Sequence, residues 1–164
     1  MAASDMIDDF IAALPGETRR PAPGEWGIRV APEHAAGSAL DVGLRLAKGI
    51  LRVQAHALDC ADGIDPWMLL WWNRQTRYVR FACTAERDSA SVPNRSQASN
   101  YSASMPNRSR EVWVHGDLPV AAVDEVGLDR LLGLVVEGAV AVRDYQKARL
   151  APADDGVGGG WLPG

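Results

Sequence analysis

The spacing of apolar residues predicts a helix near each end of the chain. Residues 4–14 carry one apolar stripe at helical spacing, with Ser4 placed to cap the first turn and Pro15-Gly16 placed to stop the helix. Residues 124–149 keep the same spacing over several turns, at Leu128, Leu131, Leu132, Val135, Val136, Ala139 and Val142. We expect this long C-terminal helix to cover one face of a sheet.

Between the two helices, alternation of apolar and polar residues predicts an antiparallel sheet of about five strands. Each strand should turn one face to the core and the other to solvent. The strands are expected at residues 26–30, on both sides of a Lys48-Gly49 turn within residues 40–58, at residues 78–83, and at residues 112–120. The segments 78–83 and 112–115 are expected to pair as a hairpin. The fold class is therefore α+β.

A tryptophan-rich segment that begins at Asp65 predicts a short middle helix. Asp65 can cap it, and Pro66 fits its first turn, where a missing N–H costs nothing. Three of the six tryptophans fall here, and the segment is apolar on every side. Such a helix is expected to lie buried between layers.

Composition divides the chain into a single domain, residues 1–150, and a Gly-rich tail, residues 151–164, that is expected to be flexible. Residues 15–24 are rich in proline and charge and predict a connector without regular structure. Residues 88–110 are rich in Ser, Asn and Arg and poor in aliphatic side chains, so they cannot bury enough apolar surface to offset their ordering entropy. We interpret them as a flexible loop inserted at a hairpin tip.

Charge and cysteine content narrow the function classes. A net charge of −4 and a pI near 5.3 argue against broad attraction to nucleic acid or to an anionic membrane. Cys60 and Cys83 are too few for a disulfide framework. The acidic N-terminus does not resemble a secretory signal, and no apolar run reaches the roughly 20 residues of a spanning helix. These features predict a cytoplasmic protein.

The polar face of the predicted sheet is the candidate binding site. It combines cationic and aromatic side chains, which anchor many protein interfaces, and it can also be an ordinary solvated surface. A second possibility is a single-stranded nucleic-acid platform, although the net charge disfavours it. The candidate partner-binding residues are Arg45, Arg52, Gln54, His56, Tyr78, Arg80, Trp113 and His115.

Catalytic and metal-binding patterns are weak in this sequence. No nucleophile-and-base motif can be named. His56 and His115 can face each other across the sheet as metal ligands, but two histidines without a placed carboxylate make a poor site. We therefore expect no enzyme activity, no cofactor and no metal.

Four segments resemble the bacterial YbjN-like proteins, whose fold is that of type III secretion chaperones. They read LRVQAHALD, DPWMLLWWNRQTRYVRFA, VWVHGDLP and LDRLLGLVVEGAVAVRDY, and the resemblance covers about residues 26–145. It implies an α+β domain with an N-terminal helix, an antiparallel sheet, a middle helix and a long C-terminal helix, often dimeric, that binds protein without established catalysis. The chain departs from the family at residues 88–110, where a short acidic turn is usual, and in the tail that contains Trp161.

Together these features predict a non-enzymatic, dimeric adaptor or chaperone-like domain that holds a segment of a protein partner. The alternative is a nucleic-acid-associated domain that uses the same basic and aromatic sheet face. Affinity that falls steeply with salt would distinguish the second from the first. The identity of the partner and the roles of residues 88–110 and of the tail stay open.

Overall fold

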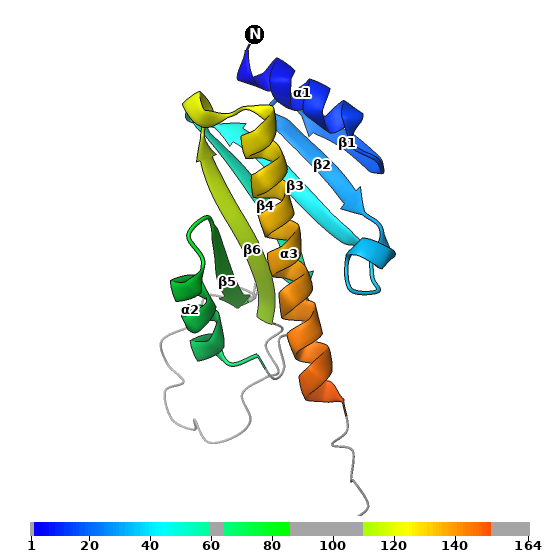
Figure 1. The fold of residues 1–164 in the computed structure, drawn as a ribbon, viewed down its shortest axis with the longest axis vertical. Coiled ribbons are helices and arrows are strands. Elements are labelled where there is room, and N and C mark those ends of the chain that lie inside the picture. The colour runs from blue at the N-terminus through cyan, green and yellow to red at the C-terminus, as the bar shows by residue number, and fades with distance from the viewer. Residues whose placement is uncertain (1, 60–63, 86–109, 152–164) are drawn as a thin grey trace, which may run out of the picture.

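The computed structural model describes residues 2–59, 64–85 and 110–151, which form an α+β fold (Figure 1). An N-terminal helix, a middle helix and a long C-terminal helix accompany one antiparallel sheet, as the sequence predicts. The elements are α1 Ala3–Ala13, β1 Glu17–Ala22, β2 Glu25–Val30, η1 Pro32–His34, β3 Leu40–Ala47, β4 Ile50–Leu58, α2 Pro66–Gln75, β5 Val79–Ala85, β6 Arg110–Pro119, η2 Val120–Ala122 and α3 Glu125–Leu150.

Within the described residues, the sheet has six strands in the order β1-β2-β3-β4-β6-β5, one more than expected. The β3–β4 hairpin turns at Lys48 and Gly49, whose φ angles of 52° and 77° are the positive values that a tight two-residue hairpin turn requires. β5 pairs with β6, with Phe81 opposite Val114, which confirms the predicted hairpin. The segment expected to be a flexible loop between them, residues 88–110, lies outside the described residues up to residue 109.

The extra strand corrects one prediction. Residues 15–24 contain β1, which pairs with β2, for example Thr18 with Ile28. Its side chains are exposed, so it has no apolar alternation for sequence reasoning to detect. Backbone hydrogen bonds to β2 stabilise it, and Pro21 is tolerated because the strand lies at the sheet edge.

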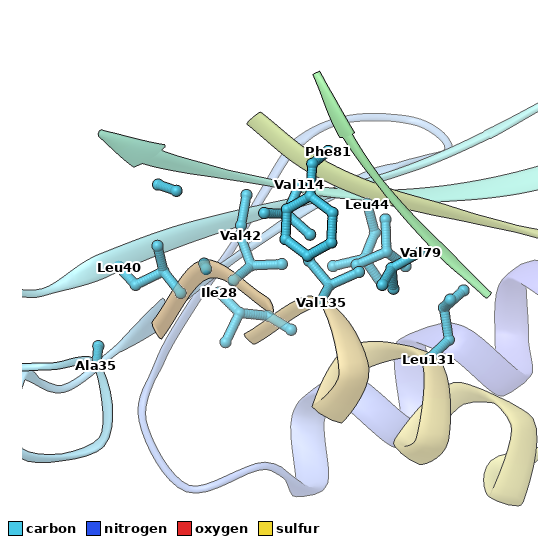
Figure 2. Packing of buried hydrophobic residues seen from close by; sticks show 14 of the residues in the cluster. Ile28, Ala35, Leu40, Val42, Leu44, Val79, Phe81, Val114, Leu131 and Val135 are labelled. Carbon is cyan, nitrogen blue, oxygen red and sulfur yellow. The ribbon is translucent and has the colours of Figure 1, made fainter. Parts of the chain in front are cut away.

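One face of the sheet is packed against all three α-helices in a single core. Figure 2 shows Val42, Phe81 and Val114 of the sheet gathered with Val135 of α3. Helix α3 can approach closely because Gly138 has no side chain: a Cβ there would lie 3.0 Å from Val114 Cγ1. The buried residues of α1 and α2 join the same core, so every described α-helix lies on this face.

The start of α1 differs in detail from the prediction. Ala2, not Ser4, occupies the N-cap position. The carboxylate of Asp5 accepts a hydrogen bond from the Ala2 N–H at 3.2 Å. The side chain of Asp5 therefore satisfies the N–H of the N-cap residue, and no N-cap side chain accepts from the first turn.

Helix α2 forms where expected but is not buried between layers. Asp65 caps it by accepting a hydrogen bond from the Trp67 N–H at 2.9 Å. Leu69 is the buried residue of this helix, whereas Trp67, Leu70 and Trp71 are 75%, 53% and 54% exposed. The helix packs on the sheet beside the edge strand β5, so only one of its sides is covered.

Two further points complete the fold. None of the helices within the described ranges is long and apolar enough to cross a membrane. Cys60 and the Gly-rich tail from residue 152 onward lie outside the described residues, as does the segment between β5 and β6.

Candidate functional site

The sheet register places seven of the eight predicted residues on one face of the sheet. Opposite pairs in the ladder share a face, and they link β3, β4, β6 and β5 in turn. We call this surface the polar sheet face: Arg45 opposite Arg52, Gln54 opposite His115, His56 opposite Trp113, and Arg80 also opposite His115. The three α-helices pack on the other side of the sheet (Figure 1).

Tyr78 is the exception and corrects the predicted set. It precedes β5 rather than lying within it. The guanidinium of Arg130, on α3, lies 5.2 Å from the centre of its ring. Because α3 covers the apolar face, Tyr78 belongs with the helices and not with the polar sheet face.

All three arginines of the polar sheet face already have partners. Arg52 donates two hydrogen bonds to Asp117, at 2.7 and 2.9 Å, and the guanidinium of Arg45 lies 3.5 Å from a carboxylate oxygen of Glu25. Arg80 donates to the backbone oxygen atoms of Thr76 and Val79, at 3.1 and 3.0 Å. Two of these arginines are therefore paired with carboxylates, and Arg80 is held by backbone oxygens.

Two pKa values on this face are shifted from their ordinary range. The hydrogen bond from Arg52 holds the pKa of Asp117 below its usual range, which keeps the carboxylate ionised. Burial, reinforced by the positive charge of Arg52, lowers the pKa of His115. At neutral pH, the imidazole of His115 is therefore mainly uncharged.

A hollow of about 440 Å³ lies on the polar sheet face over β2, β3 and β4. Gly27 of β2 lies opposite Gly43 of β3, so two adjacent positions on this face lack side chains. The side chain of Arg19 lies over Gly27: a Cβ at this glycine would be 2.8 Å from Arg19 Nε. Charged residues around the hollow include Arg19, Glu25, Asp41, Arg45 and Arg52.

The two histidines considered as a metal pair from the sequence do not lie directly opposite each other. His115 lies opposite Gln54 and Arg80, whereas His56 lies opposite Trp113, farther along β6. The His56 and Trp113 rings contact each other, with centroids 4.9 Å apart. The two histidines therefore occupy different positions along the strands.

Helix α2 carries a second surface, which sequence reasoning assigned to the core. Trp67, Leu70 and Trp71 are spaced i, i+3 and i+4, so they share one side of the helix, and all three are more than half exposed. We call these three residues the α2 surface. Large exposed apolar side chains that lie together mark an interaction site more often than scattered ones do.

The α2 surface continues into an apolar groove of about 370 Å³ between α2 and α3, with β5 between them. Trp71 belongs to both, and Glu137 of α3 is the acidic residue of the groove. We call this feature the α2–α3 groove. Its lining is Trp71, Trp72, Gln75, Thr76, Val79, Phe81, Leu134, Glu137, Gly138 and Ala141.

Two contacts hold α2 in the position that creates this groove. The side-chain amide of Asn73 donates to the Phe81 backbone oxygen at 2.9 Å and accepts from the Phe81 N–H at 2.7 Å. Trp72 packs against the rings of Phe81 and Tyr145, at centroid distances of 5.3 and 5.4 Å. Asn73, two residues before the helix ends at Gln75, thus fixes the position of α2 against β5.

Comparison with known proteins identifies a solved structure that has a similar fold. No protein-family model matches the sequence, and no curated protein matches it. Among solved structures, the chain is similar to the crystal structure of YbjN, a proposed transcription regulator from E. coli, with a TM-score of 0.59 over 88% of this chain and 91% of that chain. The sequence identity is 12%, so the likeness shows a shared fold. The YbjN resemblance inferred from the sequence motifs is confirmed at that level.

Proposed function

We propose that this chain, which has the fold of YbjN, is a non-enzymatic adaptor or chaperone-like domain that binds a helical segment of a protein partner. The binding site is the α2 surface together with the α2–α3 groove, rather than the polar sheet face expected from the sequence. One observation carries this proposal: two tryptophans and a leucine lie exposed on one side of α2 and lead into an apolar groove.

The energetics favour this surface as an anchor. Removing about 100 Å² of apolar area from water on each tryptophan contributes about 2.5 kcal/mol. Tryptophan is also enriched among the few interface residues that carry most of the binding energy. Trp67 and Trp71 expose enough surface to supply this contribution without disturbing the core.

The shape and charge of the groove indicate the kind of partner. Its walls are two helices, and an amphipathic helix binds such a groove through apolar side chains spaced i, i+3, i+4 and i+7. Glu137 lies in the groove wall among apolar residues. The expected partner segment therefore has an apolar stripe with a basic residue beside it.

Nucleic-acid association is the second candidate, because YbjN is described as a proposed transcription regulator. The hollow rimmed by Arg19, Arg45 and Arg52 would be its contact point. Pairing of Arg45 with Glu25 and of Arg52 with Asp117 weakens this candidate, since those charges would have to exchange partners to meet phosphates. Dimerisation and a cytoplasmic location stay predictions.

Photo-crosslinking tests the site directly. A photoreactive residue is placed at position 71 on the α2 surface or at position 113 on the polar sheet face, and crosslinked segments from the source cells are identified by mass spectrometry. A peptide of the crosslinked segment is then titrated against the wild type, Trp71→Ala and Leu70→Glu. We expect both variants to bind at least tenfold more weakly, because truncating an interface anchor costs about 2 kcal/mol or more.

Trp113→Ala is the matched control, an aromatic truncation on the opposite side of the sheet, and should bind like the wild type. Weaker binding by Trp113→Ala with unchanged binding by Trp71→Ala would contradict the proposed site. Crosslinks confined to a second copy of the chain would identify the groove as a dimer interface. Nuclease-sensitive recovery with a steep salt dependence would favour the nucleic-acid candidate.

A further inference from the structure

Three side chains able to bind a metal meet where β4 ends and β6 begins. His56, Asp59 and Glu111 each offer one ligand atom, and these atoms lie within 4.8 Å of one another. We call this group the His-Asp-Glu cluster. The sequence offered no carboxylate for a site at His56, whereas the structure brings two.

A β-bulge brings Asp59 to the same face as His56. In the ladder with β6, His56 pairs with Trp113 and Leu58 pairs with Val112, so β4 carries one extra residue, Ala57, between the two pairs. In a regular strand, residues three apart point to opposite faces. The extra residue reverses this relation, so that Ala57 and Leu58 both pack toward the core and Asp59 returns to the polar sheet face.

Glu111 reaches the cluster from the neighbouring strand. It lies two residues before Trp113 on β6, so the two side chains point to the same face of the sheet. Because Trp113 pairs with His56, Glu111 lies on the face that carries His56. The indole N–H of Trp113 donates to Glu111 Oε2 at 3.0 Å, which orients the carboxylate. In metal sites, a hydrogen bond donated to a ligand carboxylate by a neighbouring side chain fixes the direction of that ligand.

The Nε2 nitrogen of His56 lies inside the cluster without a hydrogen bond. This atom is inaccessible to solvent. It lies 3.2 Å from Asp59 Oδ1, close enough for an ion pair although the geometry is not that of a hydrogen bond. A buried polar nitrogen left without a hydrogen bond costs free energy, and a cation shared with the two carboxylates would satisfy it.

From this geometry we infer that His56, Asp59 and Glu111 bind one divalent first-row transition-metal cation of the Zn²⁺ and Mn²⁺ class. The two carboxylates balance the charge of the ion. An imidazole nitrogen with two carboxylate oxygens suits these metals, whereas Ca²⁺ prefers an all-oxygen site. Water completes the coordination.

The cluster needs only a small adjustment to close around an ion. Ligand atoms bound at about 2.1 Å from a metal lie at most about 4.2 Å apart. Asp59 is 86% exposed and can turn freely, whereas His56 is 29% exposed and held by its contact with Trp113. Binding therefore moves the Asp59 carboxylate toward a fixed histidine, and it links the end of β4 to the start of β6.

Calorimetric titration with Zn²⁺ and with Mn²⁺ tests this site on the full, untagged chain after treatment with a chelator. The wild type should bind one ion, and its Tm should rise when Zn²⁺ is added. His56→Ala, Asp59→Asn and Glu111→Gln should each bind at least about tenfold more weakly and lose the rise in Tm. Asp59→Asn changes an exposed side chain, so its folding is not in question.

Two controls separate this site from other ligands in the chain. His115→Ala removes a histidine from the same face outside the cluster and should leave the affinity unchanged, as should the double variant Cys60→Ser, Cys83→Ser. Absence of binding by the wild type overturns the inference. So does affinity that is retained in all three cluster variants or lost in the cysteine double variant.

Discussion

At the scale of single residues, His115 shows how the surroundings of one side chain set its protonation. It lies opposite both Gln54 and Arg80 in the sheet, and the Arg52–Asp117 pair is nearby. Burial is the larger cause of its lowered pKa, and the positive charge of Arg52 adds to it. Neither effect follows from the sequence, because both depend on neighbours brought from other strands.

The lowered pKa of His115 predicts a loss of stability in mild acid. The unfolded chain, with a histidine pKa near 6.5, binds a proton more readily than the folded chain, so the free energy of unfolding falls as the pH drops below that value. His115→Gln should lose less stability than the wild type between pH 7.5 and pH 5. For a half-buried group, we expect the difference in the free energy of unfolding to be a few tenths to about 1 kcal/mol. Urea unfolding at both pH values measures it.

His34→Gln, at an exposed histidine, is the control for this experiment. The Asp117 carboxylate acts in a separate window: its pKa lies below the ordinary 3.8, so its contribution is present above that value and is lost only in stronger acid. An identical dependence of stability on pH in His115→Gln and the wild type would contradict the assignment.

At the scale of elements, α2 shows how an edge strand and a short helix support each other. β5 is the last strand of the sheet, and the Phe81 N–H and carbonyl oxygen are bonded by Asn73 of α2. Asn73 therefore pairs with the strand as another strand would, and protects an edge that could otherwise pair with a second chain. The same contact holds α2 in the position where Trp71 and Trp72 line the α2–α3 groove.

Asn73→Ala should loosen α2 from the sheet. It removes two hydrogen bonds and leaves the Phe81 backbone groups without this partner, which we expect to cost about 1–2 kcal/mol. Hydrogen exchange should become faster at the Phe81 amide and across α2 before it does so in β3 and β4. Arg74→Ala, at the adjacent exposed residue, should exchange like the wild type; equal protection in all three proteins would show that Asn73 does not hold the helix.

At the scale of the whole molecule, Arg143 ties α3 to two distant segments. It donates to the backbone oxygens of Ala35, Ser38 and Ala39 in the loop before β3, at 2.7, 2.7 and 3.2 Å. It also donates to the oxygen of Ala57, the extra residue of the β4 bulge, at 2.9 Å. One side chain therefore satisfies carbonyl groups from two segments far apart in the sequence, and burial lowers its pKa.

Arg143→Lys should destabilise the fold although it keeps the charge. A single ammonium cannot reproduce the planar fork that reaches four carbonyls, so we expect a loss of about 2 kcal/mol in the free energy of unfolding. Urea unfolding measures it. Arg149→Lys, on the exposed end of α3, is the matched control and should unfold like the wild type; a similar result for Arg143→Lys would mean that these bonds contribute little.

The sequence by itself determined the elements whose own periodicity requires them. The β3–β4 hairpin, the pairing of β5 with β6 and the length of α3 follow from local alternation, helical spacing and a turn at Lys48-Gly49. Seven of the eight predicted side chains share a face for the same reason, because strand alternation fixes the direction of each residue.

Only the tertiary structure decided which surfaces are covered. The edge strand β1 forms through backbone pairing with β2, Trp67 and Trp71 of α2 are exposed because the helix lies beside an edge strand, and the bulge at Ala57 turns Asp59 toward His56. Each of these features depends on contacts between elements, and the bulge depends on two strands that are distant in the sequence. The type and spacing of the residues therefore determine which face of a strand or helix each side chain lies on. Contacts with neighbouring elements determine whether that face is buried, exposed or part of a site.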